Sequence, residues 1–259
     1  MSLIGEERKQ KILDLLELNG KVSSSELVQL FDVSKETVRR YLDELEGQAK
    51  LKKVYGGAVK PSVIFEESPY LERITLKREE KNQIGRQAAG LIRDGEVIFL
   101  DEGTTLLTVI PHLTQTGLTV LTHSFPAATL LMEQQNQGRF DGRILFLGGE
   151  ISALHARCAG SMTETALGHY YIDKAFISVD GIHAEAGLTS LDDSKSAVSR
   201  KAISHATEVI VAADYTKLGH RFPYKLGDLE DISFILCNQA PPSDWNEALA
   251  KHPLRWITP

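Results

Sequence analysis

The first 60 residues carry apolar side chains at helical spacing in three stretches, which predict three helices. These are residues 3–18, 27–31 and 35–46. The stretch Ser23-Ser24-Ser25-Glu26 has the spacing of a capping box and predicts the start of the second helix. Only Asp32-Val33-Ser34 separates the second helix from the third. This tight connection predicts a helix-turn-helix.

The third predicted helix has two faces that require different surroundings. Its apolar stripe consists of Val38, Leu42 and Leu45. The polar residues lie off this stripe, near the N-terminus of the helix: Ser34, Lys35, Thr37, Arg39 and Arg40. Cations gain nothing from the helix dipole there, whereas DNA phosphates attract them and arginine can bridge guanine edges in the major groove. We expect a DNA-reading helix; the alternative is a solvated helix with ordinary surface charges.

A short basic stretch follows the third helix. Residues 51–59 alternate in the manner of two strands around Gly56-Gly57, which predicts a wing. Its basic and aromatic residues, expected to lie over phosphate or the minor groove, are Lys52, Lys53 and Tyr55. The alternative interpretation of the lysines is a charged edge strand that avoids aggregation.

Beyond a Pro-, Ser- and Glu-containing stretch at Pro61 to Pro69, apolar runs alternate with helical patterns. The runs cover residues 97–100, 118–122, 144–147, 172–179, 209–213 and 232–236, and the helical patterns cover 77–94, 104–113, 124–135, 161–170 and 194–205. Strands that alternate with helices predict an α/β domain with a mostly parallel sheet covered on both faces. We expect a DNA-binding domain at 1–60, a linker at 61–76 and an α/β domain at 77–259.

Polar residues and glycines follow five of the predicted strands. These groups are Asp101 to Thr105, His123-Ser124, Gly148-Gly149, Asp180-Gly181 and Asp214 to Lys217. The carboxyl ends of parallel strands meet at one edge, where ligands bind. Each group alone is explained as a turn or a helix cap, but together they predict a site for an anion such as phosphate.

Composition describes a folded chain whose charge is unevenly distributed. Of the 259 residues, 42% are hydrophobic and 25% charged, and the net charge is -6. Residues 34–60 nevertheless hold seven basic and four acidic side chains, a local excess that suits DNA. Two cysteines without paired spacing, no membrane-length apolar run and a charged start predict a cytoplasmic protein with no membrane contact.

The chain resembles the DeoR family of bacterial transcription regulators. In the first 60 residues the matching stretches are 8–16, 33–40, 45–46 and 53–58, and in the α/β domain they are 101–105, 175–182, 187–189 and 212–219. The resemblance implies a winged helix-turn-helix followed by a sensor domain similar in fold to ribose-5-phosphate isomerase and glucosamine-6-phosphate deaminase. Three positions depart from the family pattern: Tyr41 stands where Asp is usual, and Ala197 and Ser199 replace an acidic residue and a lysine, for which Lys195 or Arg200 are candidate substitutes.

The resemblance also implies the partners, which are operator DNA, a phosphorylated sugar or related anion, and further copies of the chain in a dimer or tetramer. The expected effector-binding residues are Asp101, Gly103, Thr104, Thr105, His123, Ser124, Gly148, Gly149, Arg157, Asp180, Gly181, Asp214 and Lys217. Arg157 is placed in a loop, where it meets phosphate or lies at the surface. Neither a cofactor nor a metal is expected, since the histidines lack an HExxH pattern.

Two other functions compete with the sensor. One is an active sugar-phosphate isomerase or deaminase fused to a DNA-binding domain, with Asp101, Asp180, Asp214 or Lys217 as acid or base. The other is an oligomerisation domain with an empty cleft. We expect a regulator rather than an enzyme, and specifically a repressor of a carbohydrate operon, because a DNA-reading helix gives the cleft a sufficient role as a sensor.

Overall fold

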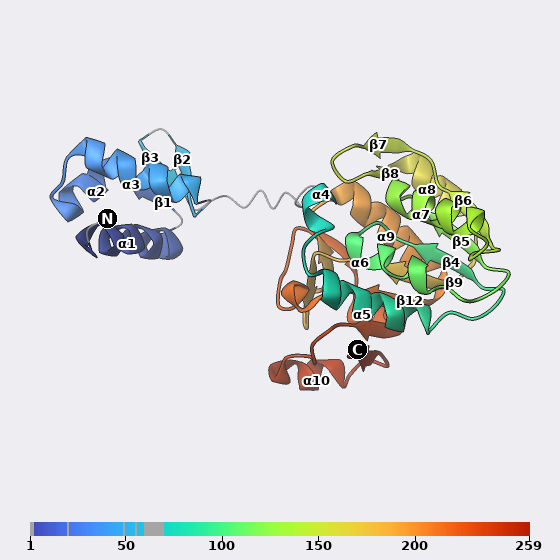
Figure 1. Ribbon diagram of the computed structural model, residues 1–259. Helices are drawn as coiled ribbons and strands as arrows, with labels where there is room; N and C mark the ends of the chain where they lie inside the picture. Colours follow the sequence, from blue (N-terminus) through green and yellow to red (C-terminus); the bar gives the residue numbers. More distant parts are fainter. Residues whose placement is uncertain (1–2, 20, 49, 55, 60–69) are drawn as a thin grey trace. The chain divides into compact units, whose positions relative to one another are not determined.

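The chain folds as two compact units, residues 1–66 and 67–259. The computed structural model describes residues 3–19, 21–48, 50–54, 56–59 and 70–259 (Figure 1). Within these residues no helix is both long enough and apolar enough to cross a membrane.

The N-terminal unit contains the three predicted helices and the predicted wing. Its elements are α1 (Leu3–Asn19), β1 (Lys21–Ser23), α2 (Ser24–Phe31), α3 (Lys35–Gly47), β2 (Lys52–Val54) and β3 (Gly57–Val59). The strands form an antiparallel sheet in the order β1-β3-β2. The capping box at Ser23 is confirmed, but α2 begins directly after it, three residues earlier than predicted. The Ser23 hydroxyl accepts a bond from the Ser25 amide, so the first turn is already helical there.

The predicted apolar stripe of α3 forms the centre of the N-terminal core. Val38, Leu42 and Leu45 are each at most 2% exposed and pack with Ile12 of α1 and Leu27 of α2. Burial of this stripe sets the rotation of α3 about its axis. The opposite face of the helix therefore faces away from the core.

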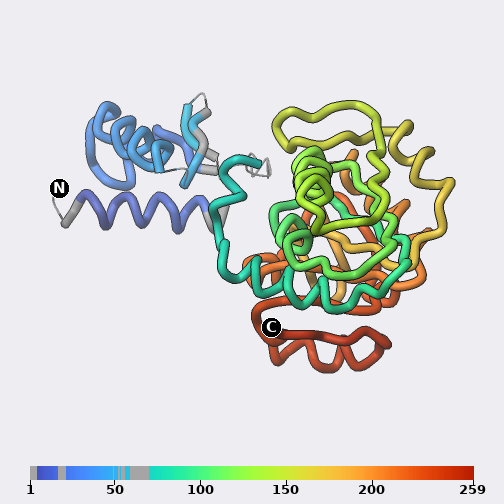
Figure 2. Tube along the Cα trace, turned by 45° about the vertical axis from the view of Figure 1, so that its right-hand side comes forward, coloured from blue at the N-terminus to red at the C-terminus, as the bar shows by residue number. Residues whose placement is uncertain are grey.

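The larger unit is built on a seven-stranded sheet in the order β15-β14-β12-β9-β4-β5-β6. The strands are β4 (Val97–Leu100), β5 (Thr119–Thr122), β6 (Arg143–Phe146), β9 (Ile172–Ile177), β12 (Ala206–Ala212), β14 (Phe234–Leu236) and β15 (Arg255–Ile257). All neighbouring pairs are parallel, so the predicted α/β class is confirmed. The chain end that carries α10 (Asn246–Leu249) and β15 lies at one edge of this unit (Figure 2).

Helices cover both faces of the sheet. On one face α5 (Arg78–Ala89) and α7 (Phe125–Asn136) pack in a core cluster with Ile98 and Leu100 of β4. On the other face α8 (Ser161–Leu167) and α9 (Asp193–His205) pack in a second cluster with Phe99. Consecutive residues of β4 thus alternate between two cores, as expected for a strand buried on both sides.

The strand order reverses between β4 and β9. From β4 the chain continues outward through β5 and β6, whereas β9, β12, β14 and β15 extend to the other side. Loops that leave the carboxyl ends of β4 and β9 therefore diverge and leave room for a ligand between them. The residues after these two strands are Asp101 to Thr105 and Ser178 to Gly181.

Two smaller sheets complete the unit. β10 (Gly181–His183), β11 (Gly187–Ser190) and β13 (Tyr224–Gly227) form an antiparallel sheet, and β7 (Glu150–Ser152) pairs with β8 (Arg157–Ala159). None of these five strands was predicted from the sequence. The hairpin replaces the loop predicted around Arg157, so that prediction is wrong.

Three predicted helices are shorter than expected, and the one predicted at 77–94 is α5, which ends at Ala89, before Gly90. The helix predicted at 104–113 is divided into α6 (Thr104–Leu107) and a 3₁₀ turn, η1 (Ile110–His112), because Pro111 has no N–H to continue an α-helix. The helix predicted at 161–170 ends at Leu167, where Gly168 follows. A short helix, α4 (Tyr70–Arg73), lies in the stretch predicted to be linker.

The close contact between α5 and the end of α6 gives a testable stability effect. A Cβ on Gly85 lies 2.1 Å from Thr108 Oγ1 and 2.5 Å from the Thr108 carbonyl oxygen. Gly85→Ala should destabilise the unit because overpacking costs about 1–3 kcal/mol, more than the gain in helix propensity of about 1 kcal/mol. Tryptophan fluorescence in urea measures this unit alone, since both tryptophans, Trp245 and Trp256, lie in it.

Gly148→Ala is the matched control, because a Cβ there meets no atom within 4 Å. Equal urea midpoints for Gly85→Ala and Gly148→Ala would show that the contact between α5 and Thr108 yields without cost.

Candidate functional site

The exposed face of α3 carries the predicted DNA-binding residues. Ser34 caps the helix by accepting a bond from the Thr37 amide at 3.2 Å, and the Ser34 and Thr37 hydroxyls lie 2.9 Å apart. Lys35 is exposed, and the Arg39 and Arg40 side chains are 68% and 66% exposed. The helix therefore presents donors and two guanidinium groups on the side opposite its buried stripe.

Weak ion pairs along α3 hold these cations. Arg39 Nε lies 4.0 Å from Asp43, and Arg40 Nε lies 3.9 Å from Glu44. The Asp43 carboxylate also pairs with the ammonium of Lys53 in the wing. Exposed pairs of this kind contribute about 0–1 kcal/mol, so the cations can exchange them for phosphate at little cost.

Two of the three predicted wing residues lie wholly or partly outside what the structure describes. Tyr55 is outside the described residues, and only the backbone of Lys52 is described. Lys53 is half-buried, and its backbone amide donates to Glu46 Oε1 at 2.7 Å. This bond joins the wing to the end of α3.

The larger unit has a cavity of about 230 Å³ at the carboxyl edge of its sheet. Its polar and charged lining residues are Arg73, Lys77, Lys81, Thr104, Thr105, Ser178, Asp180, Lys195, Asp214, Thr216 and Lys217, and Gly103 also lines it. Loops after β4, β9 and β12 all contribute, as the strand order implies. Five basic and two acidic side chains leave an excess of positive charge, which favours an anionic ligand.

Lys81 of α5 is the most unusual cation of this cavity. It is 6% exposed, and its ammonium donates to Thr104 Oγ1 at 2.8 Å and to the Arg73 carbonyl oxygen at 2.7 Å. Burial lowers the pKa of Lys81, an effect that Asp214 opposes and Arg73 and Lys217 reinforce. Its hydrogen-bond partners are thus neutral oxygens, and among the described residues no carboxylate lies within 4.0 Å of its ammonium.

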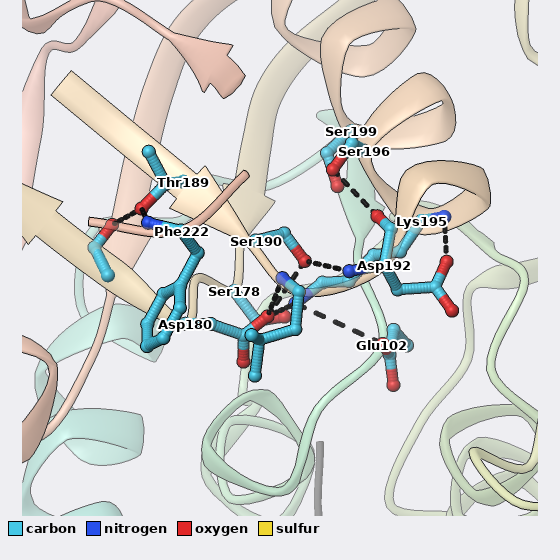
Figure 3. A network of polar contacts seen from close by, with 12 residues as sticks. Glu102, Ser178, Asp180, Thr189, Ser190, Asp192, Lys195, Ser196, Ser199 and Phe222 are labelled. Carbon is cyan, nitrogen blue, oxygen red and sulfur yellow. Dashed lines mark hydrogen bonds and ion pairs between the residues drawn. The ribbon is translucent and has the colours of Figure 1, made fainter. Parts of the chain in front are cut away.

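Asp180 lies between two lysines at the end of β9. One of its oxygens is 3.8 Å from Lys195 and the other is 4.0 Å from Lys217. The Ser190 hydroxyl and the Leu191 amide donate to it at 2.7 and 3.0 Å (Figure 3). Although burial alone raises the pKa of Asp180, the two lysines and these hydrogen bonds lower it to about 2. At neutral pH this group is an anion that accepts hydrogen bonds.

Six predicted effector-binding residues line the cavity, and seven do not. The lining residues are Gly103, Thr104, Thr105, Asp180, Asp214 and Lys217. The others are Asp101, His123, Ser124, Gly148, Gly149, Arg157 and Gly181. For these seven the structure shows contacts inside the fold instead.

Asp101 and His123 support the loop that follows β4 through buried hydrogen bonds. Asp101 is 1% exposed and is bonded to His123 Nε2 at 2.8 Å, to Ser199 Oγ at 3.0 Å and to the Ser178 amide at 3.2 Å. His123 is fully buried, and its Nδ1 lies 2.6 Å from the Cys158 carbonyl oxygen. Burial raises the pKa of Asp101, but the interactions with His123 and Lys195 and the bond from the Glu102 amide together outweigh burial and lower the pKa. Both residues hold the sheet edge together.

Arg157 is an internal ion-pair partner rather than a loop or surface residue. It lies in β8 at 1% exposure, with Nη2 2.8 Å from Asp192 and Nη1 3.4 Å from Glu102. The alternative of a surface arginine is therefore wrong, and the predicted effector-binding arginine does not line the cavity. Its charge is used to compensate carboxylates behind the cavity.

The remaining four residues have structural roles. Ser124 caps α7, and the Gly148 carbonyl oxygen accepts from Thr163. A Cβ at Gly149 would lie 2.6 Å from the Ala159 carbonyl oxygen, and one at Gly181 would lie 2.4 Å from the His220 carbonyl oxygen. Both glycines are thus required for close backbone packing.

Three of the cations that line the cavity precede β4, the first strand of the seven-stranded sheet. None of them was predicted from the sequence. Arg73, Lys77 and Lys81 precede β4, so no strand end marked them, and their helical pattern alone gave no sign of a site. Of the two candidate substitutes on α9, Lys195 lines the cavity, whereas Arg200 donates to the Lys225 carbonyl oxygen. Among the described residues, no group of three or more His, Cys, Asp or Glu side chains is arranged to hold a metal ion.

Comparison with known proteins identifies both units. Residues 8–63 match the DeoR-like helix-turn-helix domain, and residues 76–239 match the DeoR C terminal sensor domain. The chain belongs to the DeoR family. It is therefore a transcriptional regulator, as predicted, and family membership does not favour the isomerase or deaminase alternative.

The relatives of this DeoR-family protein include named repressors. It is 36% identical over 236 residues to the HTH-type transcriptional repressor GlcR of Bacillus subtilis (strain 168), a match that covers 91% of this chain and 89% of that protein. It is 28% identical to the glycerol-3-phosphate regulon repressor of Escherichia coli (strain K12), over 95% of this chain and 96% of that protein. The lactose phosphotransferase system repressor of Staphylococcus epidermidis (strain RP62A) is 31% identical, over 89% of this chain and 90% of that protein.

Solved structures resemble the chain more remotely. A ribose 5-phosphate isomerase A of Methanocaldococcus jannaschii is 21% identical, with a TM-score of 0.39 and 54% of each chain covered. An eIF2B beta of Chaetomium thermophilum is 12% identical, with a TM-score of 0.43, over 88% of this chain and 60% of the other. Similarity this remote assigns no function.

The three departures from the family pattern have different surroundings. Tyr41 is 6% exposed in the N-terminal core, and the Arg40 guanidinium lies 5.7 Å from the centre of its ring. Ser199 is buried and donates to Asp101, while Ala197 is half-buried. Lys195 lies one helical turn before Ser199 on the same face of α9, so its cation reaches Asp180 and the cavity.

The depressed pKa of Asp180 predicts how the stability of the larger unit depends on pH. Its folded pKa of about 2 lies below the ordinary aspartate pKa of 3.8, so its ionisation stabilises the fold above the latter value. That contribution, on the order of 2 kcal/mol, is lost as the pH falls through both values. Asp180→Asn should therefore lower stability at pH 7 and flatten the acid dependence in urea titrations followed by tryptophan fluorescence.

Asp228→Asn is the matched control, since the Asp228 carboxylate is exposed and pairs with Lys225 at the surface. If Asp180→Asn unfolds with the same dependence on pH as the wild type, Asp180 does not carry this ionisation energy.

Proposed function

We propose that this protein represses a carbohydrate operon by binding operator DNA through α3 and the wing, and that a phosphorylated sugar bound in the cavity controls it. In this proposal residues 1–60 bind DNA, and residues 77–259 sense the effector and assemble a cytoplasmic homo-oligomer. The names of the relatives support the choice of ligand, because they include repressors of a glycerol-3-phosphate regulon and of a lactose phosphotransferase system.

The observation that carries the effector assignment is the buried ammonium of Lys81. Within the described residues the hydrogen bonds of this ammonium go to neutral oxygens, and Asp214 acts on it only through its charge, so an anion in the cavity compensates the cost of burial. Thr104 and Thr105 add hydroxyl donors beside it, and Lys217 adds charge. Phosphate matches this combination of cations and hydroxyl donors.

The carboxylates of the cavity suit the sugar part of such a ligand. Asp180 and Asp214 line the cavity, and Asp180 is ionised at neutral pH. Carboxylates accept hydrogen bonds from hydroxyl groups, whereas they repel phosphate. We therefore assign the phosphate to the side of Lys81 and the sugar hydroxyls to the side of Asp180.

The DNA assignment rests on the exposed cations of α3. A single small module buries too little surface for a selective site, whereas two modules related by a two-fold axis read two half-sites. Homo-oligomer formation is part of the proposal for this reason.

Removing both arginines of α3 tests the DNA assignment. The DNA probe is a duplex that the wild-type protein has selected from a random library. The double variant Arg39→Ala with Arg40→Ala should bind this duplex more weakly, by about 1–3 kcal/mol for each base that an arginine reads. If an arginine contacts phosphate only, its single variant should instead reduce the salt slope by about one unit. Fluorescence anisotropy titrations at several salt concentrations measure both effects.

Lys11→Ala, an exposed change on α1, is the control for charge alone. Unchanged affinity in the double arginine variant would exclude α3 as the reading helix. Sedimentation of the same complexes counts the chains on each duplex, and one chain per duplex would contradict the proposed homo-oligomer.

Calorimetry with a panel of pentose, hexose and triose phosphates, each paired with its unphosphorylated form, tests the effector assignment. Lys81→Met should lower affinity by about 10- to 100-fold, the value of a hydrogen bond to a charged group.

The affinity of the wild type should also depend on pH. Because burial lowers the pKa of Lys81, the affinity should begin to fall at a lower pH than it would if Lys81 had the pKa of an ordinary lysine. Bound phosphate favours the ammonium form, so binding should take up protons in that pH range.

Lys225→Met, which changes an exposed lysine outside the cavity lining, should bind as the wild type does. Binding of the unphosphorylated sugars as tightly as the phosphates would contradict a phosphate site. No binding by any member of the panel would overturn the effector assignment itself.

A further inference from the structure

One wall of the cavity comes from the first described residues of the larger unit. Residues 70–81, here called the connector segment, comprise α4, a turn and the start of α5, and they follow residues 60–69 directly in the chain. Three of the five cations of the cavity belong to this segment: Arg73, Lys77 and Lys81. The other two, Lys195 and Lys217, follow strands of the larger unit. A ligand held by both groups links the connector segment to the sheet edge.

Among the described residues, few apolar contacts hold the connector segment in place. Leu71, Ile74 and Leu76 are 77%, 42% and 56% exposed, so they contribute little burial energy. The described polar contacts include the Tyr70 amide with the Leu154 carbonyl oxygen at 3.1 Å and the Lys81 ammonium with Thr104. A segment held mainly by polar contacts is sensitive to a charge that arrives beside them.

Arg73 is the member of this segment whose ion pair can change partner. Its Nη2 lies 3.6 Å from Glu102, a carboxylate at the end of β4 that is 1% exposed. Glu102 also lies 3.4 Å from Arg157 and 4.0 Å from Lys195, both of which are 1% exposed (Figure 3 shows Glu102 and Lys195). Glu102 therefore stays compensated when Arg73 turns away, and no buried anion is left alone.

Arg73 is more exposed than Arg157 and Lys195, the other two described partners of Glu102, although Lys195 also lines the cavity. The Arg73 side chain is 14% exposed, and it lines the cavity together with Lys81, whose ammonium bonds to the Arg73 carbonyl oxygen. A phosphate at Lys81 thus lies beside the backbone of Arg73 and competes with Glu102 for its guanidinium. Arginine binds phosphate in a bidentate manner, which favours the exchange.

We propose that Arg73 couples effector binding to DNA binding, by exchanging its ion pair with Glu102 for the phosphate and so changing the placement of the connector segment. The inference rests on the proposed function, since it requires a phosphorylated effector. A ligand changes operator affinity only if it discriminates between two states of the protein, and the position of Arg73 supplies that discrimination. Arg73 is a positioning residue for DNA binding, because it acts through the connector segment.

The test measures operator affinity without effector and at saturating effector, with the panel member that binds the wild-type chain most tightly. The ratio of these two affinities does not depend on how tightly a variant binds the effector once the site is saturated. We expect a ratio of about 5- to 150-fold in the wild type and a ratio within about two-fold of one in Arg73→Ala. Arg73→Lys, which keeps the charge without the bidentate geometry, should be intermediate.

Lys217→Ala is the matched control, because Lys217 is a cation of the same cavity that lies outside the connector segment. It should bind the effector more weakly than the wild type does but show the full affinity ratio at saturation. Calorimetry verifies saturation of each variant, and circular dichroism verifies that each is folded.

The outcomes separate this inference from the proposed function. A wild-type chain that binds no phosphorylated sugar overturns the proposed function and, with it, the role of Arg73. Effector binding with an undiminished ratio in Arg73→Ala overturns the coupling role alone. Equal loss of the ratio in Arg73→Ala and Lys217→Ala also overturns it, since the effect then belongs to the cavity as a whole. If Arg73→Ala is unfolded, Arg73→Lys decides by the same ratio.

Discussion

Carboxylates buried at the carboxyl edge of the parallel sheet impose the constraint on which the larger unit depends. Asp101 and Glu102 follow β4 and Asp180 follows β9, and none of the three is more than 3% exposed. Each must be compensated inside the fold, because an isolated buried charge costs several kcal/mol. The partners come from distant parts of the chain: His123, Arg157, Lys195 and Lys217, together with Arg73.

This compensation also explains why a cation-rich cavity forms at that edge. Arg157, which pairs with Glu102, is fully buried. Lys217, which pairs with Asp180, and Arg73, which also pairs with Glu102, are partly exposed. Lys81 adds a further cation that is bonded to neutral oxygens. The same electrostatic cluster therefore stabilises the sheet edge and leaves positive charge available to an anion.

The sheet edge of the larger unit and the exposed face of α3 use ion pairs in opposite ways. At the sheet edge the pairs are buried, so breaking one leaves an uncompensated charge in a medium that solvates it poorly. On α3 the pairs of Arg39 and Arg40 are exposed, and water and salt screen them. The first arrangement suits a site that must keep its shape, and the second suits a surface whose cations exchange partners at little cost.

The sequence alone determined most of the local structure and the family. The capping box at Ser23, the stripe of α3 and the bounds of β4 depend on residues close together in the chain, so local patterns predict them well. The parallel sheet and the polar residues at its carboxyl edge followed from the alternation of strands and helices. Only the tertiary structure decided which residues at that edge face the cavity. Asp101 turns inward to His123, Arg157 pairs with Glu102 across 55 residues, and Lys81 enters from a helix before the first strand. Buried charges are compensated by residues that are close in space but distant in the chain, so the spacing of residues along the sequence does not predict these pairs.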